Sequence, residues 1–212
     1  MKRIFAILLL LVGLGVPARA DDVVIELFAS ANCPSCPKAH KLMSEISETR
    51  DDVLVLTWAV DYWDYLGEPD PRASQDATAR QRAYVDRFRV RAPYTPQTVY
   101  NGVKQCPGVS PRRVRRNIKD VAKEDMLPVE IERTGDRWRV QGDTQGRTLD
   151  IFLLELESAG YDEIGIVNAI TAVRALAPFA GGVADINATC DGTCALVVQE
   201  ANFGPIVAAA RL

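Results

Sequence analysis

The hydrophobic and polar positions of residues 22–125 alternate between the patterns of strands and helices. Val23 to Phe28 form an apolar run that only Glu26 interrupts, as expected for a buried strand. From Ala39 to Ile46 the apolar residues recur at helical spacing. The remaining elements predicted in this half are strands over 53–60 and 98–100, a helix within 73–88, and a helix that starts at Ser110 and ends before Pro128. This alternation predicts an α/β fold for residues 21–125.

The pattern changes beyond Pro128 to short runs separated by clusters of glycine, asparagine and aspartate. Residues 129–132 and 137–140 flank a glycine turn with runs in which apolar and polar positions alternate, which predicts a β-hairpin. Further strands are predicted over 149–156, 164–173, 195–199 and 206–210. We therefore expect residues 126–212 to form a second, mainly antiparallel β domain.

Residues 1–20 have the three parts of a secretory signal peptide. Met1-Lys2-Arg3 is basic, Ile4 to Val16 is apolar, and Ala18-Arg19-Ala20 supplies the small residues that precede a cleavage point. The apolar stretch is short for a membrane span, and no later stretch is long and apolar enough to form one. We expect a mature chain without a membrane span, secreted or periplasmic, where disulfides persist.

The charge balance bears on the class of partner. The chain has 25 basic and 28 acidic residues, and loss of Lys2, Arg3 and Arg19 with the signal peptide leaves 22 basic residues. This acidic excess argues against a nucleic-acid partner. Apolar residues make up 48% of the chain, so a core can form without disulfides in its place.

The sequence Cys33-Pro34-Ser35-Cys36-Pro37 stands between the first predicted strand and the first predicted helix. Two cysteines at this spacing can close a small disulfide, and the free amide groups at a helix start stabilise a thiolate. The placement predicts a redox dithiol in which Cys33, the more exposed thiol, attacks a partner disulfide and Cys36 resolves the mixed disulfide. The alternative is a structural disulfide or a buried thiol pair. Under the redox hypothesis the partners are protein or small-molecule thiols and disulfides, and no cofactor is expected.

Three other cysteines follow later in the chain. Cys190 and Cys194 flank an Asp-Gly turn signal, which brings the two residues close enough for a structural disulfide. Cys106 is then the free thiol, although its pairing with Cys190 or Cys194 is an open alternative.

A second segment supports the redox hypothesis through a resemblance. Tyr94-Thr95-Pro96-Gln97, ahead of an apolar strand and the turn Asn101-Gly102, resembles the cis-proline segment of the thioredoxin superfamily and especially of glutaredoxins. With the cysteine motif, the segments Val60 to Gly67 and Arg80 to Tyr84 resemble more closely a family of secreted bacterial thioredoxin-like proteins. That family has a β-rich C-terminal extension and no established reaction. The resemblance implies a thioredoxin-like domain over residues 21–125.

The resemblance also implies roles for individual residues. A cis Thr95–Pro96 bond would face the dithiol, where Thr95 and Pro96 offer backbone polar groups to an extended substrate. Thioredoxins place a buried acid under the dithiol as a proton acceptor. The candidates here are Glu26, one position earlier than the usual spacing, and Asp61, at the end of the second strand. Asp61 can equally be a solvated residue at a strand end.

Two more groups are candidates for substrate contact. Trp63 lies in the densest aromatic cluster of the chain and is a candidate wall of the active-site groove, although such residues also cap core edges. Four arginines lie near the start of the last helix of the first half, where they are unfavourable to its dipole and suit an anion such as a carboxylate. They are Arg112, Arg113, Arg115 and Arg116. A solvated helix face is the simpler interpretation.

Two rival functions come from other classes. Cys33, Cys36 and His40 have a spacing that suits copper(I) or zinc, which predicts a metal carrier. The chain can also be a binding module that keeps the fold without turnover. Such a module has no need to retain Cys33, Cys36 and Pro96, all of which are present, so we favour an extracytoplasmic thiol–disulfide oxidoreductase.

Overall fold

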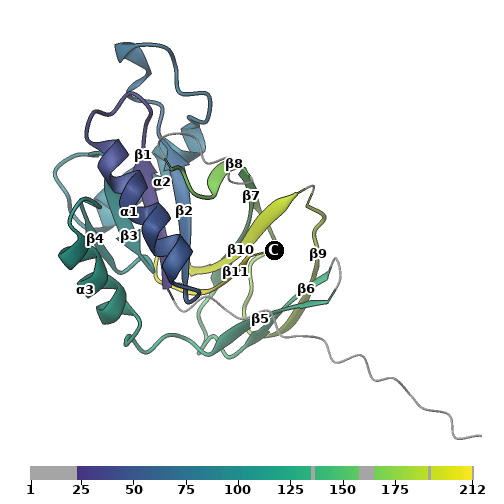
Figure 1. Cartoon of the computed structure of the whole chain (residues 1–212). Helices are drawn as coiled ribbons and strands as arrows, with labels where there is room; N and C mark the ends of the chain where they lie inside the picture. Colours follow the sequence, from purple (N-terminus) through teal and green to yellow (C-terminus); the bar gives the residue numbers. More distant parts are fainter. Residues whose placement is uncertain (1–22, 135–136, 158–164, 191, 212) are drawn as a thin grey trace, which may run out of the picture.

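A computed structural model describes residues 23–134, 137–157, 165–190 and 192–211 (Figure 1). The predicted signal peptide and the turn at 135–136 lie outside these residues. The elements of the first half are β1 Val23–Ala29, α1 Cys36–Thr49, β2 Val53–Ala59, the short 3-10 helix η1 Asp64–Leu66, α2 Gln75–Arg87, β3 Gln97–Tyr100, β4 Lys104–Cys106 and α3 Pro111–Val121. The second half contains β5 Val129–Thr134, β6 Arg137–Gly142, β7 Leu149–Glu157, β8 Ala169–Ala175, β9 Gly182–Asn187, β10 Thr193–Glu200 and β11 Ile206–Arg211.

The strands form two sheets. The larger has eight strands in the order β11-β10-β7-β8-β2-β1-β3-β4, and the smaller has three in the order β5-β6-β9. In the larger sheet β1 is parallel to β2 and antiparallel to β3, whereas β7, β8, β10 and β11 pair antiparallel with one another. An α/β fold with a mainly antiparallel second half is therefore confirmed. The division into two domains stays a prediction, and the larger sheet crosses the predicted boundary at residue 125.

The two halves of the larger sheet meet at β2 and β8. One Cα pair, Thr57 with Ala169, joins these strands in parallel. Side chains extend the junction, because the Asn168 amide donates to the Val55 carbonyl at 2.8 Å and the Thr57 hydroxyl donates to the Val167 carbonyl at 2.7 Å. Gly165 and Asn168 have positive φ angles, 71° and 46°, so the strand predicted from residue 164 begins only at Ala169.

The helices cover both faces of the sheet. Alternate residues of β1 point to opposite sides, so Ile25 and Leu27 pack with α1 and α3, whereas Val24 and Phe28 pack with α2. Figure 1 shows α1 in front of β1 and β2, with α3 beside it. The longest helix among the described residues is α1, with 14 residues, and no described helix has the length and apolar character to span a membrane.

The smaller sheet closes a further core against the C-terminal strands. Trp138 of β6 is 1% exposed and packs in one cluster with Leu149 and Leu153 of β7 and with Leu196 of β10. Figure 1 shows β5, β6 and β9 below and to the right of the larger sheet. This region lies away from α1, at whose N-terminus the cysteine motif stands.

Candidate functional site

The structure joins Cys33 and Cys36 in a disulfide between β1 and α1, with a Cα–Cα distance of 5.4 Å. The turn after β1 is closed by hydrogen bonds from the Cys33 amide to the Ser30 carbonyl and from the Cys36 amide to the Cys33 carbonyl, each 3.1 Å. The helix starts at Cys36, so Cys33 precedes the first turn. Pro37 fits that turn because its missing N–H has no helical acceptor there.

Both cysteines are almost fully buried in the disulfide form. Cys33 is 1% exposed and Cys36 0%, and both belong to the core cluster under α1. The expectation that Cys33 stands out as the exposed cysteine is therefore not met in this state. The exposed residues of the motif are Pro34, Ser35 and Pro37. Pro34 and Ser35 lie between the two cysteines and mark the surface over the disulfide.

The segment Tyr94-Thr95-Pro96 lies beside the disulfide. The Thr95–Pro96 peptide bond is cis, as the resemblance implied, and Pro96 is buried. The Ser35 hydroxyl lies 3.6 Å from the Cys33 sulfur and donates to the Thr95 carbonyl at 3.5 Å. Ser35 thus links two of the predicted site residues. Sequence reasoning gave it no role, although its place between the two cysteines pointed to the surface over the disulfide.

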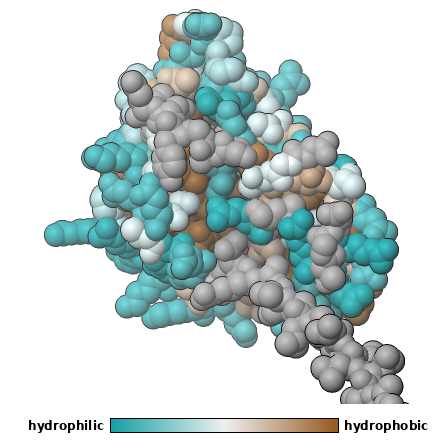
Figure 2. All heavy atoms as spheres, turned by 45° about the vertical axis from the view of Figure 1, so that its right-hand side comes forward, coloured by the Kyte–Doolittle hydropathy of each residue, from teal (hydrophilic) through white to brown (hydrophobic). Residues whose placement is uncertain are grey.

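Trp63 lies in another loop and contacts Thr95. Its indole N–H donates to the Thr95 hydroxyl at 2.8 Å, and its half-buried ring packs against the core cluster that holds both cysteines. The loop continues through Tyr65 and Leu66, which are 79% and 52% exposed. Figure 2 shows hydrophobic colour at the top of the molecule, where this loop projects. The predicted groove wall is therefore in contact with the predicted substrate segment.

Asp70 is a site residue that sequence reasoning missed. It is only 7% exposed, and its carboxylate accepts hydrogen bonds from the amides of Ala31 and Arg72 at 2.8 and 3.0 Å. The Asn32 amide donates to the Glu68 carbonyl at 2.9 Å, so a second bond joins the two loops. These contacts fix the turn that leads to Cys33. In the sequence Asp70 stands between two prolines, and this pattern indicates only a turn.

Glu26 lies on the opposite face of the sheet from the disulfide. Its carboxylate is buried and forms an ion pair with Arg80 of α2, and it accepts a hydrogen bond from Tyr84. Gln199 of β10 joins the network by accepting from Arg80 at 2.8 Å and donating to Tyr84 at 2.9 Å. Burial raises the pKa of Tyr84 far above its usual value, so its hydroxyl stays protonated and donates. The physical reason for this placement is strand alternation, because Glu26 is one position away from the face of Leu27.

Asp61 is turned toward α2. Its carboxylate accepts a hydrogen bond of 2.6 Å from the Thr78 hydroxyl, and its backbone amide donates to the same hydroxyl oxygen at 3.2 Å. It is partly exposed, as expected for a residue just after β2. Neither candidate proton acceptor thus has a contact with Cys33 or Cys36 among the described hydrogen bonds and ion pairs.

His40 is buried one helical turn beyond Cys36. It is 4% exposed and lines a small cavity with Ser30, Thr57 and Asp70. Within the described part of the chain, no group of three or more histidine, cysteine, aspartate or glutamate side chains has a geometry that would hold a metal ion. The three-ligand metal site of the carrier hypothesis is therefore not formed in this disulfide state.

The remaining cysteines have the predicted pairing. Cys190 and Cys194 form a disulfide with a Cα–Cα distance of 6.4 Å, and Cys106 is free and buried. Thr98, Tyr100 and Asn117 surround the Cys106 sulfur, with polar atoms at 3.6, 3.5 and 3.4 Å. The structural role of the second disulfide stays a prediction.

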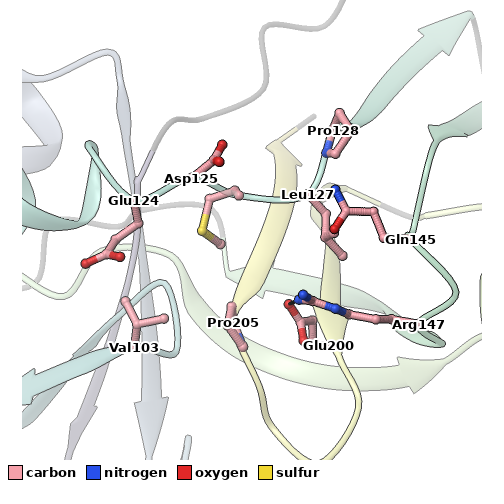
Figure 3. Close-up of a pocket in the computed structure, with 10 residues that line it drawn as sticks. Val103, Glu124, Asp125, Leu127, Pro128, Gln145, Arg147, Glu200 and Pro205 are labelled. Atoms are coloured by element: carbon pink, nitrogen blue, oxygen red, sulfur yellow. Dashed lines mark hydrogen bonds and ion pairs between the residues drawn. The ribbon is translucent and has the colours of Figure 1, made fainter.

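A separate pocket of about 520 Å³ lies between the segment after α3 and the turn that joins β10 to β11. Figure 3 shows Arg147 and Glu200 facing one another in this pocket, where they form an ion pair, while Leu127 and Pro205 supply apolar surface. None of the predicted site residues lines it. Its one arginine, Arg147, has Glu200 as its acidic partner.

The comparisons with known proteins give a family and a similar solved structure. Residues 24–166 match the family described as "Protein of unknown function (DUF1223)". A crystal structure of a protein from Agrobacterium tumefaciens is similar to this chain, with 25% sequence identity and a TM-score of 0.75. The similarity covers 92% of this chain and 95% of that one. Among curated proteins, none matches this chain.

Proposed function

Because this chain belongs to the DUF1223 family, whose description states no reaction, we propose a function from the site itself: thiol–disulfide exchange at Cys33 and Cys36. We further propose that residues 21–125 are a thioredoxin-like unit that carries this dithiol. The C-terminal strands then continue its sheet beyond β2.

The order and pairing of the elements from β1 to α3 support the thioredoxin-like interpretation. The strand β1 leads into the cysteine motif and α1, and its neighbours are β2 in parallel and β3 antiparallel. The helix α2 packs on one face of this sheet, and α1 and α3 pack on the other. The order of strands and helices agrees with the order from which the resemblance was drawn, together with the motifs at 33–37 and 94–97.

One observation carries the functional proposal. The Cys33 sulfur, the Ser35 hydroxyl and the Thr95 carbonyl form a continuous chain of contacts at 3.6 and 3.5 Å. An extended substrate that pairs with the backbone at Thr95 would hold its own sulfur near Cys33. A structural disulfide would need no such polar backbone segment at its surface.

The chemistry consists of two sulfur transfers. In the reduced protein the Cys33 thiolate attacks one sulfur of a substrate disulfide, whose S–S bond breaks as the other sulfur leaves and takes a proton. The Cys36 thiolate then attacks Cys33, which releases the second substrate sulfur and closes the Cys33–Cys36 bond. The substrate gains two electrons and the dithiol loses two. The same steps run in reverse when the disulfide form meets a substrate dithiol.

The experiment combines exchange kinetics with trapping. Purified protein should reduce a neutral disulfide, bis(2-hydroxyethyl) disulfide, when it is supplied with a chemical reductant. A Cys36→Ser variant should accumulate a mixed disulfide through Cys33, because the resolving thiol is gone. Cys106→Ser is the matched control and should exchange like the unaltered protein. Absence of exchange in the unaltered, reduced protein would reject an oxidoreductase in favour of a binding module.

We also propose that the protein acts in the periplasm or after secretion. The basic, apolar and small-residue parts of residues 1–20 support this proposal. N-terminal sequencing of protein from the extracytoplasmic fraction of the producing cells should start at Asp21. Recovery of the full-length chain in the cytoplasmic fraction alone would contradict it.

A further inference from the structure

We propose that the exposed arginine face of α3 selects acidic polypeptides as substrates of the Cys33–Cys36 dithiol. This inference rests on the proposed function and adds the class of substrate. The face is defined by Arg112, Arg113, Arg115, Arg116 and Lys119, all of which are exposed.

One side of α3 is buried against the core, and the four arginines and Lys119 lie on its other, exposed side. Val114, Ile118 and Val121 face the core, and Asn117 is buried against Cys106. None of the ion pairs formed among the described residues includes an arginine of this helix, since Asp120, the acid on the helix, pairs with Lys104. Among the described residues, the four guanidinium groups therefore have no ion-pair partner, although the hydrogen bond from Lys104 and the charge of Arg116 lower the pKa of Asp120.

The segment that leads from β3 to α3 adjoins the candidate site through two contacts. Gly108, just before α3, lies so close to Ala39 of α1 that an added Cβ would be 3.6 Å from the Ala39 side chain. On the other side, the Tyr94 hydroxyl donates a hydrogen bond to Gln105 of β4. Tyr94 directly precedes Thr95, whose carbonyl contacts Ser35. The start of α3 therefore borders the segment that would pair with a substrate.

The charge of Arg113 in α3 also acts on Tyr94. Burial raises the pKa of Tyr94 to about 12, the nearby Cys106 adds to the shift, and the positive charge of Arg113 opposes it. Arg113 is hence close enough to act on the residue beside the substrate segment. A negative side chain of a substrate at this position would meet the same positive potential.

Negative charge near its N-terminus would stabilise α3. Its first turn contains no acidic residue, although the free amide groups there favour one. Arg112 and Arg116 are one turn apart, a spacing at which like charges repel. An anionic partner would supply the missing negative charge and would reduce the repulsion between the two arginines. The arginines spread over more than one turn of α3, which suits an extended acidic polypeptide better than one small anion.

The experiment measures exchange with two cystine peptides that are identical except for aspartate or lysine residues beside the disulfide. The unaltered protein should react about tenfold faster with the acidic peptide, and the difference should shrink as salt is added. Arg112→Glu/Arg113→Glu should reverse the preference. Folding should not suffer, because acids in the first turn suit the helix dipole. The control, Arg137→Glu/Arg211→Glu, changes the net charge equally at distant exposed sites and should keep the preference.

The outcomes separate this inference from the proposed function. Exchange with bis(2-hydroxyethyl) disulfide but equal rates for both peptides would overturn the selection of acidic substrates and leave the oxidoreductase intact. So would a preference that survives in Arg112→Glu/Arg113→Glu. Loss of binding to vesicles of anionic lipid in that variant, without discrimination between the peptides, would make the face a membrane contact instead. No exchange with any disulfide would overturn the proposed function and this inference with it.

Discussion

The indole N–H of Trp63 donates a hydrogen bond of 2.8 Å to the hydroxyl of Thr95. The two residues are 32 positions apart and come from different loops, so the bond joins the projecting loop to the segment beside the disulfide. The same Thr95 presents its carbonyl to Ser35. Trp63 therefore holds in place the backbone that we propose to bind the substrate.

Replacement of Trp63 by phenylalanine should slow exchange. The variant keeps an aromatic ring against the core but cannot donate to Thr95, and a lost neutral hydrogen bond costs about 1 kcal/mol. The substrate segment is then held less firmly, so we expect KM for a cystine peptide to rise several-fold with a smaller change in kcat.

The matched control is Tyr65→Phe in the same loop, where the side chain is 79% exposed and the change should leave exchange unaltered. Steady-state kinetics of both variants at one pH make the comparison. Equal KM values for Trp63→Phe and the unaltered protein would show that the bond to Thr95 has no part in substrate binding.

Glu26→Gln should destabilise the protein without slowing exchange in the folded molecules. The substitution leaves Arg80 charged and buried without its counter-ion, which typically lowers the free energy of unfolding by about 3–5 kcal/mol. Because Glu26 points away from the disulfide, the rate per folded molecule should stay the same. Urea unfolding and exchange kinetics on one preparation measure both quantities.

Asp185→Asn provides the control for this ion-pair prediction. Asp185 also pairs with an arginine, Arg139, but both side chains are exposed, and solvent weakens such pairs. Its unfolding midpoint should therefore change little. A marked loss of exchange rate in folded Glu26→Gln would restore Glu26 as the proton acceptor of the dithiol.

Local patterns predicted most elements because burial of one face or of both leaves a periodic or a continuous run of apolar residues. The strand β1 and the helices α1 and α3 have the apolar spacing that such burial requires. The strands β4 and β9 were missed for the converse reason, since Lys104–Cys106 is three residues long and Gly182–Asn187 is largely exposed. The junction of β8 with β2 combines a backbone hydrogen bond from Thr57 to Asn168 with bonds of their side chains, a long-range contact that no local pattern encodes.

Some residues of the candidate site could likewise be predicted from the sequence, and others could not. Cys33, Cys36, Thr95 and Trp63 have side chains or motifs with recognisable chemistry, and the structure brings them together. Asp70 acts on Cys33 only through the backbone of Ala31, so its role depends on the path of a loop. Glu26 and Asp61 were the two candidate proton acceptors. One position along a strand decides the face, and strand alternation places Glu26 with Arg80, away from the disulfide.

Replacement of His40 by glutamine should leave both exchange and metal affinity unchanged. Neither sulfur transfer requires an imidazole, and His40 lies in a small cavity beside Asp70. Titration of the reduced protein with copper(I), together with exchange kinetics, measures both properties. The comparison variant is Cys36→Ser, which should lose turnover. A marked fall in copper affinity in His40→Gln would support the three-ligand metal carrier instead.

The disulfide between Cys190 and Cys194 should contribute little to stability. It closes a loop of five residues, and the chain-entropy estimate for so short a loop is about 2 kcal/mol or less. Cys190→Ser/Cys194→Ser should therefore fold and exchange normally, with a slightly lower unfolding midpoint in urea. In the unaltered protein Cys106 is buried, so alkylation without reduction should label it only after unfolding. Peptide mapping that links Cys106 to another cysteine, or a double variant that fails to fold, would contradict this pairing and its minor role.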